Sequence, residues 1–131
     1  MGLTNAGQDA LFTQHLSTSA QPAAFNYTAL TANSTAFSAA STTLTGEITT
    51  SGGGLIRKQS TYAHTTGTTT ATLTTTYTAN GSDSKPVTIA KVGVFNASTS
   101  GTLGYETLLS STATITNTGD SLTVTHTITR A

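Results

Sequence analysis

The side chains that could carry acid–base, nucleophilic or metal chemistry are few and widely spaced. The histidines are His15, His64 and His126, and the acidic residues are Asp9, Glu47, Asp83, Glu106 and Asp120. No two histidines have the close spacing of a shared metal site, and the chain has no cysteine to support one. No serine lies in a nucleophile-elbow pattern, although a triad assembled from distant residues stays open. The sequence therefore predicts a protein without catalytic residues, metal or cofactor.

Among these residues, His126 has the most informative position. It shares the apolar face of the last predicted strand with Leu122, Val124 and Ile128. A lone histidine on such a face is most often a satisfied core or interface residue. A histidine cluster around a subunit axis is the functional alternative.

Glu47 and Arg57 flank a run of three glycines at residues 52–54. The two charges could pair across the run, but a solvated loop charge and an ordinary strand residue are the preferred interpretation. The glycine run is not a phosphate-binding loop, because it lacks the following Lys-Ser/Thr and the strand-to-helix setting.

Composition narrows the class of protein further. About a quarter of the 131 residues are threonine, 8% are charged, and five basic side chains balance five acidic ones. Threonine is β-branched and suits a pleated β-sheet surface that is partly exposed to solvent, so we expect a β-rich structural or binding module. The chain has no basic stripe for a phosphate backbone and no apolar run near the roughly 20 residues of a membrane span. We therefore expect neither nucleic acid nor membrane as a partner. The first residues also lack the features of a secretory signal.

The helix candidate lies at residues 3–17. Its apolar positions recur with helical spacing and include Leu3, Leu11 and Phe12. A flexible segment containing Ser, Gln and Pro follows, so residues 1–22 are assigned to an N-terminal helix or arm. Two alternatives stay open: the helix packs on its own domain, or it docks on a neighbour.

The remaining residues, 23–131, are predicted to form a β-domain. Apolar residues alternate with threonines over much of the second half, which is the period of a strand with one buried face. The expected strands cover residues 23–30, 55 to beyond 62, 68–79, 86–96, 102–109, 110–116 and about 122–129. Strands at roughly ten-residue spacing with turn signals between them favour an all-β, antiparallel two-sheet sandwich of the jelly-roll type.

Two segments depart from this simple alternation. Residues 31–54 are small and polar, and they are expected to form a long surface excursion with at most one short helical turn. Residues 86–96 are apolar on both faces. This pattern indicates a central strand covered on both sides, or a bulge near Ala90 and Lys91.

Several motifs, in the same order along most of the chain, resemble those of tailed-phage virion proteins. They are LTNAG at 3–7, TAFSA at 35–39, TLTGE at 43–47, KVGVFNA at 91–97, STSGTL at 98–103 and GDSLTVTHTIT at 119–129. Members of this group are described as head decoration (cement) or tail-fibre-like proteins. They often carry an acidic residue at the position of Lys91 and a glycine-rich segment at 31–34. The resemblance implies no catalytic residues.

The resemblance implies a non-enzymatic cement protein on the outer surface of a phage head, bound to the major capsid protein. The lean core and the edge strands without protective charge favour a homo-oligomer, for which a trimer is expected. The residues expected at the capsid or subunit interface are Leu3, Leu11, Phe12, Phe37 and His126.

The alternative is a receptor- or carbohydrate-binding module of the phage tail. Sugar sites generally use aromatic platforms, for which Tyr62, Tyr77 and Tyr105 are candidates, although tyrosines on strands are more often packing residues. A hydrolase on a sandwich scaffold has no support beyond dispersed His and Asp residues.

Overall fold

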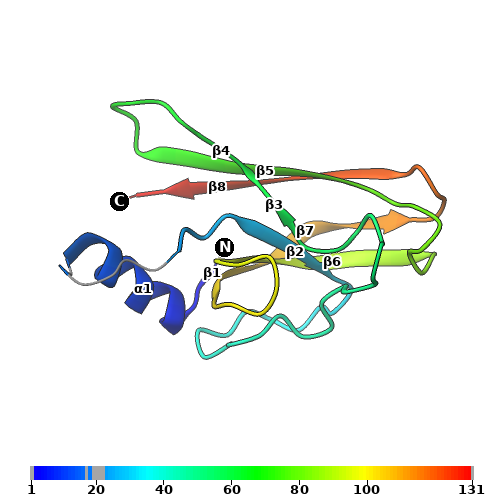
Figure 1. The fold of residues 1–131 in the computed structure, drawn as a ribbon, viewed down its shortest axis with the longest axis horizontal. Coiled ribbons are helices and arrows are strands. Elements are labelled where there is room, and N and C mark those ends of the chain that lie inside the picture. Colours follow the sequence, from blue (N-terminus) through cyan, green and yellow to red (C-terminus); the bar gives the residue numbers. More distant parts are fainter. Residues whose placement is uncertain (1, 17, 19–22, 131) are drawn as a thin grey trace.

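Two antiparallel β-sheets lie face to face, with a helix at one end (Figure 1). The computed structural model describes residues 2–16, 18 and 23–130, so the expected hinge at 17–22 lies outside the described residues apart from Thr18. The elements are β1 (Gly2–Leu3), α1 (Asn5–Leu16), β2 (Tyr27–Thr31), β3 (Lys58–Gln59), β4 (Thr61–His64), β5 (Thr70–Thr78), β6 (Val87–Phe95), β7 (Leu103–Ile115) and β8 (Ser121–Thr129). The expected all-β, two-sheet fold is confirmed, and jelly-roll connectivity stays a prediction.

The strands divide unequally between the two sheets. One sheet has the order β1-β7-β6-β2-β3 and the other has the order β4-β5-β8. Leu30, Ile89 and Val92 from the five-stranded sheet pack against Tyr77 and Val124 from the three-stranded sheet. This contact between the inner faces forms the main core.

Ser60 marks the point where the chain changes sheet. The strand expected from residue 55 to beyond 62 was wrong as a single strand, because β3 and β4 belong to different sheets. The backbone N–H of Ser60 donates to Asn26 at 2.7 Å. Its side-chain oxygen lies 2.8 Å from the hydroxyl of Thr28 and 2.7 Å from that of Thr75, one in each sheet. A buried serine bonded to both layers allows the crossover within one residue.

β6 is central in its sheet and covered on both faces, as expected from its apolar residues. Val94 packs with Leu73 of the opposite sheet, whereas Phe95 packs with Leu44 from the excursion. The pairing of β6 with β7 is also irregular between Ile89 and Lys91, which confirms the expected bulge.

β7 is one strand of thirteen residues, so the expectation of two strands at 102–109 and 110–116 was wrong. Ala113 lies opposite Ile89, and Leu108 lies opposite Lys91. Between these two pairs, β7 therefore has more residues than β6, and its additional residues form a bulge. The apparent boundary in the sequence is a bulge inside a continuous strand.

The excursion at residues 31–54 lies against the outer face of the five-stranded sheet. It contains bends, turns and an isolated bridge between Thr31 and Glu47, and the short helical turn considered from the sequence is absent from this described segment. Leu44 is buried among Ala29, Phe95 and Leu103. The excursion thus covers an apolar sheet face that would otherwise contact water.

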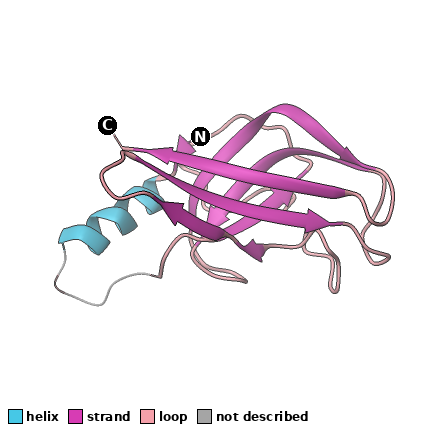
Figure 2. Ribbon diagram, turned by 90° about the horizontal axis from the view of Figure 1, so that it is seen from above, coloured by secondary structure: helices cyan, strands magenta, loops and turns pink. Residues whose placement is uncertain are grey.

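The helix begins two residues later than expected, because Leu3 belongs to β1. The backbone N–H of Gly7 donates to the hydroxyl of Thr4 at 3.0 Å, so Thr4 caps the helix. A side chain at Gly7 would place its Cβ 2.4 Å from the carbonyl oxygen of Gly104 in β7. The start of α1 therefore packs on its own domain, the helix projects from one end of the sheets (Figure 2), and docking on a neighbour stays a prediction.

Candidate functional site

Three of the five expected interface residues come together at the helix end of the molecule. Leu3, Leu11 and Phe12, together with Gln8 and Leu16, line a shallow apolar hollow of about 370 Å³. Phe12 is 57% exposed and Leu16 is 76% exposed, which is high for large apolar side chains. We call the surface formed by Leu11, Phe12 and Leu16 the helix-end patch.

The helix-end patch is held by bonds at the start of α1. The hydroxyl of Thr4 donates toward the carbonyls of Leu103 and Gly104, and the backbone N–H of Thr4 donates to Gly104 at 2.9 Å. The backbone N–H of Asn5 donates to Ala39 of the excursion at 2.8 Å. The start of the helix is therefore anchored to both β7 and the excursion, while its last turns carry Phe12 and Leu16 at the end of the molecule (Figure 1).

Phe37 lies on the opposite side of β1 from Leu3. Its ring covers Gly2 so closely that an added Cβ would lie 2.2 Å from ring carbons. Phe37 is 40% exposed and shares a second shallow hollow with Glu106 and Leu108. Leu3 is half-buried and instead packs with residues of the inner core, so it offers less free apolar surface than Phe12.

His126 lines neither of the two hollows formed by the other four expected interface residues. It lies on β8 opposite Leu73 of β5, and its side chain is buried. Burial lowers the pKa of His126 from 6.5 to about 4, so the imidazole is neutral at neutral pH. Its Nε2 has no hydrogen-bond partner within the described part of the chain. In this chain His126 is a core residue.

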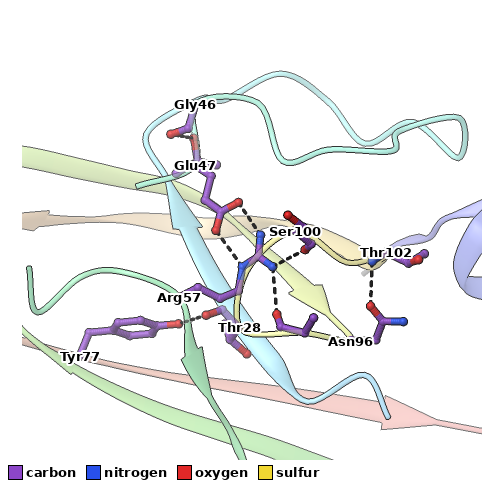
Figure 3. A network of polar contacts seen from close by, with 10 residues as sticks. Thr28, Gly46, Glu47, Arg57, Tyr77, Asn96, Ser100 and Thr102 are labelled. Carbon is purple, nitrogen blue, oxygen red and sulfur yellow. Dashed lines mark hydrogen bonds and ion pairs between the residues drawn. The ribbon is translucent and has the colours of Figure 1, made fainter. Parts of the chain in front are cut away.

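Arg57 forms the most extensive polar network (Figure 3). Its Nε and Nη2 donate to the two carboxylate oxygens of Glu47 at 2.8 and 2.7 Å, and Nη1 donates to the carbonyls of Ala97 and Ser100 at 3.0 and 2.7 Å. The guanidinium carbon lies 3.5 Å from the centre of the Phe95 ring. Pairing of Glu47 with Arg57 is confirmed, and the preferred solvated interpretation was wrong because the excursion folds back over the sheet.

A groove of about 360 Å³ runs beside this network. Its wall is mainly apolar, although six of its lining residues carry hydroxyl groups, namely Thr42, Thr43, Thr49, Ser98, Thr99 and Ser100. Four donor contacts of Arg57 are already used within the protein, and its guanidinium covers the Phe95 ring. The groove therefore presents neither a free anion clamp nor an open aromatic platform.

Neither a family model nor a curated protein sequence matches this chain.

Two further features, a metal site and a membrane span, were considered for the described residues. In residues 2–16, 18 and 23–130, no group of three His, Asp or Glu side chains is placed to hold a metal ion. Across the same residues, no helix has the length and apolar character needed to cross a membrane.

Two of the three tyrosines considered as sugar platforms are internal, in line with the preferred interpretation that they are packing residues. Tyr77 is fully buried and its hydroxyl donates to the carbonyl of Thr28, while Tyr105 packs edge-on against Phe25 in the core. Tyr62 is 64% exposed and borders an apolar cleft with Phe25 and Ile128. Tyr62 is therefore the tyrosine among these three that could receive a sugar ring.

Sequence reasoning missed the buried ion pair between Lys91 and Glu106. The ammonium of Lys91 donates to Oε1 of Glu106 and to the carbonyl of Thr35, the latter at 3.1 Å. Both charged side chains are almost completely buried. The available signal was a lysine inside the largely apolar strand β6 and a glutamate in the next strand of a weakly charged chain.

Proposed function

We propose that this chain is a non-enzymatic virion structural protein that decorates the outer surface of a phage head. In this proposal the major capsid protein receives the helix-end patch, and the β-domain stays outside. Self-association of the chain is part of the proposal. The observation that carries the proposal is the exposure of Phe12 and Leu16 on an anchored helix.

Apolar burial supplies the binding free energy in this proposal. Fully burying a large apolar side chain contributes about 1.5–3 kcal/mol, before the costs of association are subtracted. Phe12 and Leu16 both have much of this contribution still available, whereas Leu3 has already used part of it in its own fold. Phe37 can add a smaller contribution at the neighbouring surface.

The rest of the surface suits a protein present in many copies. The outer face of the three-stranded sheet pairs Thr76 with Thr123 and Thr78 with Ser121, with hydroxyl distances of 3.0 and 3.1 Å. Such a face is polar without carrying charge. Because the net charge is zero, long-range electrostatic steering toward the shell should be weak.

Copy number in purified virions tests the proposed location. Quantitative mass spectrometry should find hundreds of copies per particle, and labelled antibody should bind the head surface. A handful of copies at the tail would instead support the receptor- or carbohydrate-binding alternative, for which Tyr62 is the available platform. Absence from virions would contradict both.

A further inference from the structure

β8 is an open sheet edge of nine residues. It stands last in the order β4-β5-β8, and within the described chain no other strand pairs with its free side. β8 contains neither a charged residue nor proline, the two common means of blocking an edge. Of the other edge strands, β3 and β4 are shorter than β8, and β1 consists of two residues that pair with Tyr105 and Glu106 of β7.

The register with β5 determines which backbone groups face outward. Thr70 lies opposite Thr129, and the pairing continues without a shift to Thr78 opposite Ser121. Just beyond the two ends, the N–H of Arg130 donates to Thr69 at 2.8 Å and the N–H of Ala79 donates to Asp120 at 2.9 Å.

Hydrogen-bonded and non-hydrogen-bonded pairs alternate along an antiparallel ladder. Arg130 and Asp120 belong to hydrogen-bonded pairs with β5, so the even-numbered residues between them also do. The odd-numbered residues therefore direct their N–H and C=O groups to the free edge. These residues are Ser121, Thr123, Thr125, Thr127 and Thr129.

This set of outward residues is self-complementary. When a second β8 runs antiparallel with Thr125 opposite Thr125, Thr123 lies opposite Thr127 and Ser121 lies opposite Thr129. Every outward residue then meets an outward residue, which allows about ten main-chain hydrogen bonds. On the inner face, the same register places Leu122 opposite Ile128, so two half-buried apolar side chains gain a partner.

Charges at the ends of β8 select the same register. With Thr125 at the centre, Asp120 of each copy lies opposite Arg130 of the other. Hydrogen bonds from the N–H groups of Asn117 and Thr116 lower the pKa of Asp120, so its carboxylate is charged at neutral pH. If the register shifted by two residues, outward-facing residues would still meet outward-facing residues, but both charge pairs would be lost.

We propose that β8 pairs antiparallel with β8 of a second copy of this chain, about a two-fold axis at Thr125. The two three-stranded sheets then become one continuous six-stranded sheet. This contact is independent of docking on a shell, because β8 and the helix-end patch are separate surfaces. A two-fold contact also predicts dimers in solution, in contrast to the trimer expected from the sequence.

Cysteine cross-linking tests the register directly, since the chain has no native cysteine. At a hydrogen-bonded pair the Cα atoms lie about 5.5 Å apart, within the range of a disulfide. Thr125→Cys should therefore form a covalent dimer under mild oxidation. Thr123→Cys is the matched control, because the two copies of residue 123 would lie about 14 Å apart along the strands. We expect cross-linking at least about tenfold faster at position 125 than at position 123. Equal rates, or no dimer from Thr125→Cys, would overturn the proposal.

Sedimentation of the intact protein tests the association itself. The wild-type chain should form a species of twice 13.3 kDa as its concentration rises. Thr125→Pro removes an outward N–H without removing a bond to β5, so it should give a folded monomer by circular dichroism. Thr125→Val keeps the N–H and should still dimerise. Three results would each overturn pairing with a second copy. The first is a trimer as the main species, and the second is dimerisation of a folded Thr125→Pro protein. The third is a wild-type monomer whose β8 amides become protected from exchange only on capsids.

Discussion

At the scale of single residues, three buried polar side chains influence stability, namely Lys91, Glu106 and His126. Lys91 and Glu106 form an ion pair with very little water contact, and His126 sits uncharged in the core. An ion pair of this kind stabilises little relative to an apolar pair, but removal of one partner leaves a buried charge without compensation. The lysine also bonds to Thr35, so the pair connects the excursion to the five-stranded sheet.

Lys91→Met should lower the free energy of unfolding by about 3–5 kcal/mol, because Glu106 then loses its cationic partner. The double variant Lys91→Met with Glu106→Leu should recover most of this loss, since an apolar pair replaces the ion pair. Urea unfolding of the wild type and both variants measures the effect. A single variant within about 1 kcal/mol of the wild type would contradict the inferred coupling.

His126 should make the folded protein less stable as the pH falls from about 6.5 to about 4. In the unfolded chain the imidazole takes up a proton below its ordinary pKa of 6.5, whereas in the folded protein burial delays protonation until about pH 4. The unfolded state therefore binds more protons between these values, and the folded protein loses about 3 kcal/mol by pH 4. Above pH 6.5 this residue adds no pH dependence.

Chemical unfolding from pH 7 to pH 4 checks this expectation. His126→Leu should remove about 3 kcal/mol from the decline. An unchanged decline in the His126→Leu protein would show that other groups cause it.

At the scale of elements, regular alternation predicted β5 and β8 well, and a run of residues that are apolar on both faces predicted β6. The errors occurred where a single residue or a bulge changed the path of the chain. Ser60 moves the chain between sheets because its hydroxyl bonds to both, and nothing in the local apolar pattern indicates those distant partners. The continuity of β7 depends on its register with β6, which is likewise a property of two segments.

The contact of α1 with β7 gives an element-scale test. Alanine is preferred over glycine inside a helix by about 1 kcal/mol, so propensity alone favours Gly7→Ala. The close carbonyl of Gly104 opposes it, because the added Cβ would lie 2.4 Å from that oxygen. We expect a net loss of about 1–3 kcal/mol from the forced displacement.

Gly81→Ala is the control for this substitution, because no atom lies within 4 Å of its added Cβ. Thermal unfolding of the two variants should show a lower midpoint for Gly7→Ala and little change for Gly81→Ala. Equal midpoints would mean that α1 can move away from β7 without cost.

At the scale of the whole molecule, the sandwich places its two association surfaces apart. The helix-end patch lies at one end of the sheets, whereas β8 runs along a side (Figures 1 and 2). Sequence patterns suggested Leu3, Leu11 and Phe12 as a group, and the structure brings them together. The sequence patterns did not show that Leu3 belongs to β1, or that His126 is enclosed by its own domain. Whether those residues are buried depends on how the strands of the two sheets pack against each other.

This arrangement also determines how docking should be tested. Deletion of residues 1–17 would remove β1 and the bonds of Thr4 to β7, so it would alter the sheet as well as the patch. Point substitutions at exposed positions avoid that difficulty. Phe12 and Leu16 are suitable because much of each side chain is free of contacts within the chain.

The most direct measurement is the occupancy of undecorated phage capsids by Phe12→Ser/Leu16→Ser protein, compared with the wild type and with Tyr62→Ser. Loss of about 3–6 kcal/mol of apolar burial should weaken binding by at least a hundredfold in the double variant. Tyr62→Ser should bind like the wild type, and raising the salt concentration should change the wild-type affinity little. Unchanged occupancy of a folded double variant would contradict docking through the helix-end patch.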